Sequence, residues 1–414
     1  MLSVYLNPMK TPPALLRTVA LLAVLTPAAL LASGIRTGFK DPDAIARGNA
    51  FVATADNPSA IYYNPAGLTQ LDGPSLTAGA YDVELQSDYT SGGGATTDMK
   101  RDFIALPEFY YAYAPHGSNF AFGLGSFVPF GLKTDWAPTS GFGTVATNNK
   151  ETDYAIAGVV AWKISPELSI GGGPVFHRID ATLSRDIPPG SGGGTFTFDG
   201  SNNALSFNAG VRWQPSAEHA FGLTYRGNYA SNLNGTSNFS FGVPTPATGN
   251  YAATGNFTFP EVIIGGYSYR PSPDWNFEAD VEWMNWDRVN TITVQNPTAV
   301  FSPAEPLVLN WNSSFFYDFG VTRQFANGMH VSVGYTYAQN STPNSSFNPA
   351  VPDANRNLFG VGVGGRVGQY DLQATVQYGI AETRTVTGDV VNPTADGTYA
   401  GRTYAFALSL SRRF

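Results

Sequence analysis

The connections between the alternating segments of this chain come in two lengths, and the two lengths alternate strictly. Downstream of residue 73, apolar and polar residues follow a period of two in fourteen stretches, which is the pattern of strands with one apolar face. Six connections are very short, and seven are long and rich in Gly, Ser, Thr, Asn and Pro. If the strands are antiparallel, all short turns lie at one rim and all long loops at the other.

The alternation continues to the last residue of the chain. In the segment "TYAFALSLSRRF", Tyr404, Phe406 and Leu408 alternate with small residues, up to Phe414. A closed barrel explains a full strand at the terminus, because its last strand pairs with its first. The fourteen predicted strands lie near residues 74–86, 105–115, 119–128, 151–164, 167–184, 204–214, 218–229, 258–270, 274–289, 311–325, 329–339, 357–367, 370–386 and 401–414.

An even number of strands of about ten residues, with short turns on one side and long loops on the other, is typical of outer-membrane β-barrels. The sequence therefore predicts an all-β fold, a 14-stranded antiparallel transmembrane β-barrel over residues 74–414. The alternative is a soluble β-sandwich, whose last strand could also reach the terminus. A sandwich does not explain the alternation of connection lengths, and the barrel is favoured.

Composition excludes several classes of function. The chain has no cysteine, which excludes disulfides, cysteine-ligated zinc and a cysteine nucleophile. Its net charge is −8 and no basic patch is visible, so nucleic acid is not expected as a partner. Its four histidines lie far apart in the sequence, and no metal or other cofactor is predicted.

The N-terminus has the pattern of a secretory signal peptide, predicted over residues 1–32. The apolar run at 18–32 follows Lys10 and Arg17, is interrupted by Pro27 and ends in small residues. It is too short and too interrupted for a membrane-spanning helix. Met9 is an alternative start to Met1. The mature protein is thus expected to leave the cytoplasm for the outer membrane of a Gram-negative bacterium.

Residues 33–73 have no alternation and precede the first predicted strand. Asp-Pro and Asn-Pro pairs break this segment into short helical turns. Its Phe39, Ile45, Phe51 and Ile61 need burial, which a mobile leader would not provide. Because fourteen strands enclose a bore too wide for barrel side chains to fill, the segment is predicted to be a hatch that plugs the lumen.

The stretch "ARGNAFVATADNPSAIYYNPAGL" resembles the N-terminal hatch of the FadL family, outer-membrane transporters of long-chain fatty acids and related hydrophobic compounds. Two further stretches, "NPAVPDANRNLFGVGVGG" and "FPEVIIGGYSYRPSPDWNFEADVEWMNW", are also similar to the family. The resemblance spans nearly the whole mature chain. It implies a hatch or gating role for Asn64, Pro65, Ala66, Arg47 and Gly48.

The resemblance also implies a route for the ligand. Hydrophobic molecules, with long-chain fatty acids as first candidate, would be captured by the extracellular loops and pass a rearranging hatch. They would leave sideways at a kink of the third strand, which carries Gly123, Gly125 and Pro129. Glycine and proline weaken a strand ladder and permit a bulge. The alternative is that the glycines only make room for neighbouring groups.

Four arginines are candidates to contact a ligand head group. A bulge in "GGGP" would switch the faces of the fifth strand and turn Arg178 inward. The family resemblance implies basic ligand-contacting residues near the outer end of this strand, and leaves the choice between Arg178 and Arg185 open. Arg212 and Arg226 share the inward parity of their strands. The alternative for each is a lumenal charge network with Glu278, Asp280 and Glu282.

No enzyme is predicted. The "GVGVGG" motif lies inside a strand with no helix after it, which does not suit a nucleotide site, and "GLGSF" lacks the last glycine of a nucleophile elbow. A hydrolase with a spatially assembled triad is the remaining enzymatic alternative. Within transport, uptake of aromatic hydrocarbons is the alternative to fatty acids, and a general diffusion porin or structural barrel is the alternative of another class. The expected partners are membrane lipid and the outer-membrane assembly machinery. The aromatic residue at the C-terminus resembles the signal that this machinery reads. The protein is expected to be a monomer.

Overall fold

The computed structural model describes residues 35–138, 140–299, 302 and 304–414, so the predicted signal peptide lies outside the described residues. Among the residues described, no helix is long and apolar enough to cross a bilayer. The helices are α1 (Pro42–Ala46) and α2 (Ala60–Tyr63), with the 3-10 turns η2 (Pro65–Gln70), η3 (Pro189–Ser191), η4 (Trp286–Arg288), η5 (Asn344–Ser346) and η6 (Pro393–Ala395).

Nineteen β segments form one antiparallel sheet. They are β1 (Gly73–Ser91), β2 (Thr96–Asp98), β3 (Phe103–Ala114), β4 (Phe120–Asp135), β5 (Asn148–Lys163), β6 (Leu168–Asp186), β7 (Gly194–Trp213), β8 (His219–Arg226), β9 (Tyr229–Phe241), β10 (Gly249–Phe259), β11 (Val262–Ser272), β12 (Trp275–Met284), β13 (Thr291–Gln295), β14 (Ala304–Val308), β15 (Ser314–Gln324), β16 (Met329–Ala338), β17 (Arg356–Val367), β18 (Tyr370–Val386) and β19 (Gly397–Arg413).

The sheet closes into a barrel of fourteen strands. Five barrel strands consist of two consecutive segments each: β2 with β3, β8 with β9, β10 with β11, β12 with β13, and β14 with β15. The last segment, β19, pairs with β1 from Ser75↔Arg413 to Ser91↔Gly397. The Phe414 N–H also donates to the Pro74 carbonyl at 2.9 Å. Closure at the terminus is therefore confirmed.

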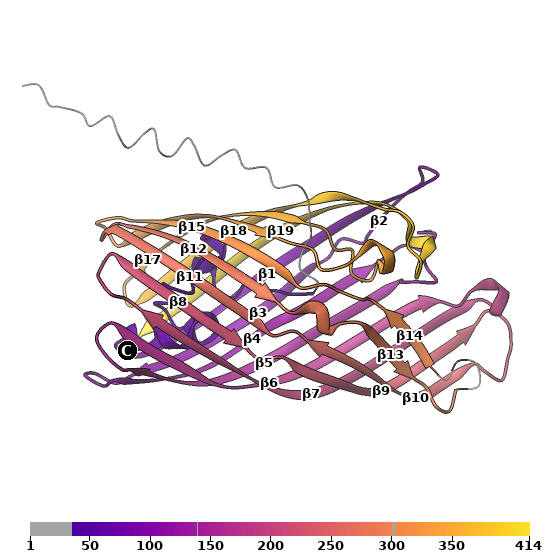
Figure 1. Ribbon diagram of the computed structural model, residues 1–414, viewed down its shortest axis with the longest axis horizontal. Helices are drawn as coiled ribbons and strands as arrows, with labels where there is room; N and C mark the ends of the chain where they lie inside the picture. Colours follow the sequence, from indigo (N-terminus) through magenta and orange to yellow (C-terminus); the bar gives the residue numbers. More distant parts are fainter. Residues whose placement is uncertain (1–34, 139, 300–301, 303) are drawn as a thin grey trace, which may run out of the picture. The chain divides into compact units, whose positions relative to one another are not determined.

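All six predicted short turns are present between strands, and Figure 1 shows tight turns gathered at the end of the barrel where the C-terminus lies. The predicted long loops are partly wrong. Residues 230–257, expected as a loop, form most of the hairpin of β9 and β10. The ladder between β6 and β7 likewise extends beyond the predicted strands, to Asp186↔Thr195. At the long-loop end, strands rich in polar residues satisfy their backbone N–H and C=O groups by pairing with one another, and composition alone does not reveal this pairing.

The wall is interrupted between β3 and β4. These segments pair only from Phe109↔Ser126 to Tyr113↔Phe122. Beyond that stretch β4 continues to pair with β5, with a register shift between Phe127 and Phe130. The two sides meet again at the far end, where the Lys100 N–H donates to the Asp135 carbonyl at 2.8 Å. The result is a window in the wall, bounded by the paired stretch of β3 and β4 toward the short turns and by the Lys100–Asp135 contact toward the long loops.

The inner and outer faces change character along the strands. In β6, Phe176 and Ile170 are exposed on the outer face, as lipid contact requires, and buried His177 points into the lumen. Two residues further toward the long loops, the inner face carries Ile179 and the outer face Arg178. Above the apolar outer band, the lumen is therefore apolar.

Candidate functional site

The segment before β1 fills the half of the lumen nearest the short turns. Asp41 caps α1 by accepting hydrogen bonds from the Asp43 and Ala44 N–H groups, at 2.8 and 3.3 Å. Every residue from Ala44 to Ala55 is buried. A Cβ added at Gly222 of β8 or Gly360 of β17 would lie 2.3 or 2.2 Å from the Val52 or Ile45 carbonyl, respectively. The barrel has small residues where this segment crosses it.

One strand, β12, holds the segment with three carboxylates. Glu278 accepts from Arg47 at 2.9 Å, from the Thr54 hydroxyl and from two backbone N–H groups. Asp280 accepts from the Phe51 and Val52 N–H groups, both at 2.9 Å. Glu282 forms a buried ion pair with Arg36 at 2.7 Å. These three carboxylates thus bind the N-terminal segment, through Arg47, Arg36 and backbone N–H groups, rather than the four arginines with which the sequence analysis grouped them.

The Asn64-Pro65-Ala66 motif joins the segment to the wall. The Asn64 amide donates to the Val52 carbonyl at 2.9 Å and to the Val211 carbonyl of β7 at 3.0 Å, and its oxygen accepts from the Ala66 N–H. Pro65 begins η2, a position where its missing N–H leaves no group unsatisfied. Asn64 thus caps η2 and also links the N-terminal segment to β7 by a hydrogen bond.

Arg47 and Gly48 lie where the segment touches β15 and β16. Gly48 has a φ of +61°, and a Cβ there would lie 2.4 Å from the Tyr335 backbone nitrogen. The Gly48 carbonyl accepts from the Thr336 hydroxyl at 2.6 Å. Both the left-handed backbone and the close approach require glycine at this position.

Two titratable groups of the segment change their pKa by burial. Burial raises the pKa of the Asp41 carboxyl to about 7, although its backbone hydrogen bonds act in the opposite direction. Burial lowers the pKa of the Lys40 ammonium to about 7, against the attraction of the nearby Glu108 carboxylate. The segment thus carries less charge at neutral pH than its sequence implies.

Two of the four predicted arginines bind this segment rather than an open cavity. Arg212 donates to the Ala53 carbonyl at 2.8 Å. Arg226 donates to the Tyr62 carbonyl at 2.8 Å and lies over the Tyr62 ring, 4.0 Å from its centre. Their inward orientation agrees with the parity of their strands.

The prediction that Arg178 faces inward is wrong. The β6–β7 register runs without a shift from Leu168↔Trp213 to Asp186↔Thr195, so "GGGP" inserts no bulge. Arg178 lies on the outer face, half exposed, and pairs with Asp180 at 3.0 Å. The position lies beyond the apolar outer band, where an outward arginine has little desolvation cost. Arg185 lies near the outer end of β6, where it pairs with Glu305 and lies over the Phe196 ring.

The residues predicted for a lateral opening divide into two groups. Pro129 lies within the window, at the register shift of β4. Gly123 and Gly125 lie in the paired stretch below it, where an added Cβ would lie 2.5 Å from Ile61 or 2.8 Å from Tyr110. These glycines make room for packed side chains, as the alternative interpretation held.

Three cavities follow one another from the long loops to the window. The outer cavity, about 90 Å³, is lined by Arg185 and shares Asn149, Leu183 and Leu307 with the apolar cavity. The apolar cavity, about 80 Å³, shares Ile35, Leu132, Lys150 and Glu151 with the wall cavity. The wall cavity, about 250 Å³, is lined by Leu106 of β3 and Val128 of β4, on the two sides of the window.

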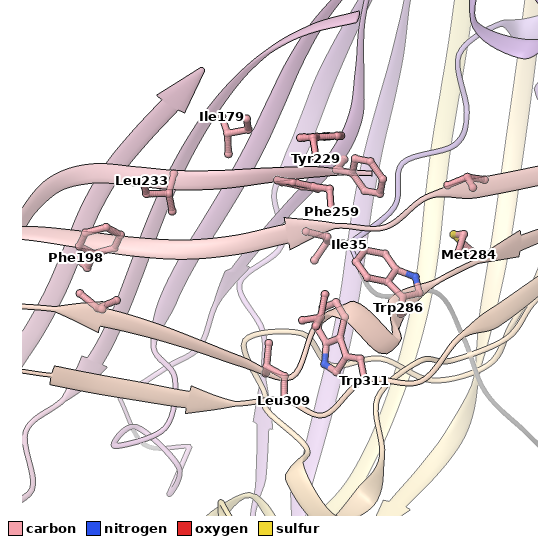
Figure 2. Close-up of a cluster of buried hydrophobic side chains, with 14 of the residues drawn as sticks. Ile35, Ile179, Phe198, Tyr229, Leu233, Phe259, Met284, Trp286, Leu309 and Trp311 are labelled. Carbon is pink, nitrogen blue, oxygen red and sulfur yellow. The ribbon is translucent and has the colours of Figure 1, made fainter. Parts of the chain in front are cut away.

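Aromatic and aliphatic side chains build the apolar cavity. Figure 2 shows Trp286 and Trp311 close together, with Phe259 and Tyr229 above them. The two indoles pack edge to face with centres 5.0 Å apart, and Phe259 stacks on Tyr229 at 4.6 Å. Trp311 and Phe259 line the cavity, whereas Trp286 and Tyr229 pack against them without lining it. Aliphatic residues such as Ile35, Ile179, Leu233 and Leu309 form most of the remaining lining, which also includes the polar Asn149, Lys150, Glu151 and Asn348. Such a surface binds apolar groups by area and offers few directional contacts.

The N-terminal segment also borders the window. Its Thr37 N–H donates to the Pro129 carbonyl at 3.1 Å, and the Gly131 N–H donates to the Ile35 carbonyl at 3.0 Å. Residues 35–37 therefore pair with β4 as a short strand where β3 does not. Ile35 lies between the apolar and wall cavities, since it lines both.

A Ser–His–Asp arrangement lies beside these cavities. His177 contacts Asp153 at 3.0 Å through Nδ1 and Ser206 at 2.8 Å through Nε2, and Tyr229 also donates to Asp153. Ser206 lines a cavity of only about 40 Å³, much smaller than the wall cavity of about 250 Å³. His177 and Tyr229 together provide hydrogen bonds to the buried Asp153 carboxyl group, and these bonds position Tyr229 at the edge of the apolar surface.

Sequence reasoning missed Arg36, Asp153 and Glu151. Arg36 adjoins the predicted signal peptide, and nothing local links it to Glu282. Glu151 and Asp153 share the parity of buried Ala155 on β5, so their inward orientation could have been inferred.

Comparison with known proteins agrees with this architecture. The profile of a family described as outer membrane protein transport protein (OMPP1/FadL/TodX) matches residues 38–414. The long-chain fatty acid transport protein of Escherichia coli K12 is 22% identical over 377 residues, covering 80% of this chain and 82% of that protein.

Solved structures of other proteins share the fold. A FadL homologue from Pseudomonas aeruginosa gives a TM-score of 0.81 at 17% identity, covering 92% of this chain and 100% of the other. The Ralstonia pickettii toluene transporter TbuX gives 0.71 at 16% identity, covering 91% and 98%. Because its barrel is closed and the family profile matches residues 38–414, this outer-membrane protein belongs to the OMPP1/FadL/TodX family of transporters of hydrophobic compounds.

Proposed function

We propose that this protein carries long-chain fatty acids passively across the outer membrane and releases them sideways through the window between β3 and β4. The observation that carries this proposal is the order of the three cavities. Each shares lining residues with the next, and the last reaches the interruption in the wall. No step of this route uses a cofactor or nucleotide.

Burial of the tail dominates binding. A buried CH₂ contributes about 0.8 kcal/mol, so sixteen carbons contribute on the order of 12 kcal/mol before ordering costs. A hydrogen bond to a charged head group contributes about 1.5–3 kcal/mol. Of the four predicted arginines, Arg185 lines the outer cavity, so we assign it first contact with a carboxylate. Its partner Glu305 must give way for that contact.

The N-terminal segment is proposed as the gate. Asn64, Pro65, Ala66, Arg47 and Gly48 hold it to the wall, and its residues 35–37 occupy the free edge of β4. Displacement of Ile35 by a ligand tail in the apolar cavity would release this edge and join the apolar and wall cavities.

A second candidate substrate is an aromatic hydrocarbon taken up by the same route. The apolar cavity favours it, because most of its lining is aliphatic or aromatic and none of the four predicted arginines belongs to it, although Lys150 does. One similar structure is that of a toluene transporter. Uptake of labelled fatty acids and labelled toluene, in cells with and without the protein, decides between the two.

The route is tested by filling the window. The Gly131→Phe change places a ring in the wall cavity, which Gly131 lines, and is expected to reduce fatty-acid uptake at least ten-fold. Gly158→Phe on neighbouring β5 is the matched control, because a Cβ there meets nothing within 4 Å. Equal uptake by both variants would contradict lateral release. Rapid swelling of proteoliposomes in sugars would instead support a general diffusion porin.

A further inference from the structure

The wall cavity passes through the barrel wall. Tyr154 of β5 is 47% exposed on the outer face, whereas Asp153 is buried on the inner face, and by this alternation Lys150 also faces outward. Tyr154 and Lys150 line the wall cavity from the outer face. Phe39 and Leu358, both buried in the lumen, line it from the inside. The cavity therefore connects the lumen with the outer surface of the barrel.

Two lysines lie side by side at the outer mouth of this cavity. Lys133 of β4 is directly opposite Lys150 of β5 in the antiparallel register, so both project from the outer face, and both line the cavity. Like charges directly opposite each other on one face of a sheet destabilise the pairing of the strands. Lys133 pairs with Asp102, whereas Lys150 forms no ion pair with any residue that the structure describes. The fold itself therefore gives no reason for a cation at position 150.

Most other charged groups of the cavity and its mouth are already paired. These ion pairs are Arg36–Glu282, Lys100–Asp135, Arg178–Asp180 and Arg356–Asp353. Glu151, next to Lys150, lies on the inner face with both carboxyl oxygens buried. On the other side of the window, the outer face of β1 carries Asp82 and Glu84. An anion at the outer mouth is therefore repelled from the β1 side and attracted to the β5 side.

The height of the two lysines suits the membrane interface. Tyr154 belongs to the exposed aromatic side chains at the end of the apolar outer band, as in the aromatic girdles of outer-membrane barrels. Lys150 lies four residues further toward the long loops, on the order of 10 Å along a tilted strand. A charged group is costly in the hydrocarbon core, so an amphiphile that enters the outer leaflet keeps its carboxylate near this level.

We propose that Lys150, with Lys133 beside it, forms an exit site that receives the carboxylate of the ligand at the outer mouth of the window. The carboxylate stays at the interface while the tail passes through the window into the hydrocarbon, so the ligand is released in the orientation of a membrane lipid. This inference rests on the proposed function and adds a site for ionised amphiphiles. A hydrocarbon without a charged head group passes the window without using it.

The test compares a charged and an uncharged ligand in cells. Lys150→Met keeps the apolar stem of the side chain and removes its charge. We expect initial uptake of labelled hexadecanoate at neutral pH to fall about three-fold or more, and uptake of labelled toluene to change less than about two-fold. Lys150→Arg should retain hexadecanoate uptake. Lys163→Met, at the short-turn end of the same strand, is the matched control and leaves both rates unchanged.

The stability of the barrel separates an exit site from a structural role. Because Lys150→Met removes a like-charge pair, the urea midpoint of unfolding in lipid vesicles should stay the same or rise. A lower midpoint, with uptake of both compounds reduced equally, would overturn the inference. If the methionine variant does not assemble, as judged by heat-modified mobility on gels, Lys150→Gln takes its place with the same expectations.

The uptake assay also separates the two proposals. If wild-type cells take up no more hexadecanoate than cells without the protein, the proposed function fails and the exit site fails with it. If wild-type uptake is present and Lys150→Met leaves it unchanged, only the exit site is overturned. Loss of co-purifying lipopolysaccharide from that variant, with uptake unchanged, would assign the lysines to a lipid phosphate instead and would equally overturn the exit site.

Discussion

The two halves of the lumen follow opposite rules. Near the short turns, the inner wall is polar and its groups are matched one by one to the N-terminal segment, as Glu278 and Asp280 show. Near the long loops, the inner wall is largely apolar, no element among the described residues fills the lumen, and cavities remain. The half near the short turns therefore resembles a protein interior that fits one partner, the N-terminal segment. The half near the long loops resembles a binding surface that can accept different apolar molecules.

The difference has an energetic basis. Directional hydrogen bonds to buried carboxylates fix one geometry and are costly to break, since a buried charge without its partner is strongly destabilising. Apolar contacts depend on area and tolerate exchange of the contacting molecule. A transporter needs a gate that returns to one position and a site that releases its ligand, and the two halves meet these needs separately.

The largest effect is expected from Glu278→Ala in the polar half. The change leaves Arg47 and two backbone N–H groups buried without an acceptor. Loss of one partner of a buried ion pair costs about 3–5 kcal/mol. Hydrogen exchange of residues 47–54 should accelerate by several orders of magnitude. Glu167→Ala, in an exposed turn, is the control, and equal protection in both variants would contradict the clamp.

A smaller loss of stability, about 2–4 kcal/mol, is expected from Ile179→Ala in the apolar half. Ile179 is buried and lines the apolar cavity. Here hydrogen exchange of residues 47–54 should stay unchanged, while affinity for long-chain ligands changes because the cavity grows. Urea unfolding in lipid vesicles and ligand titration measure the two quantities. Accelerated exchange in the N-terminal segment would show that the halves are coupled.

Asn64→Ala is expected to weaken docking of the segment by about 1–3 kcal/mol, because it leaves the Val52 and Val211 carbonyls without their donor. Fatty-acid uptake should fall while the barrel still assembles, since Asn64 lies outside the strands. Uptake assays and heat-modified mobility test these outcomes. Unchanged uptake would remove Asn64 from the proposed gate.

The barrel could be predicted from the sequence because its cause is local: alternation fixes the two faces of each strand, and connection length fixes the rims. The polar half could be predicted in part, since Glu278, Asp280 and Glu282 share one parity, but their partners lie more than 220 residues away in sequence. The apolar half could not be predicted, because the inner face changes from polar to apolar within β6 without any change of register. A rule that assigns polar residues to the lumen fails there.

The smallest effect is expected from Arg178→Ala, next to Ile179 on the same strand. The Arg178 side chain lies on the outer face, and its ion pair with Asp180 is half exposed, with both side chains at 49%. Such pairs contribute about 0–1 kcal/mol, so stability, ligand affinity and uptake should all remain close to those of the wild type. An arginine that held a ligand carboxylate in the lumen would instead lower affinity about ten-fold or more when removed. Because Arg178 and Ile179 differ by one position, the pair of variants shows directly which face of β6 the ligand contacts.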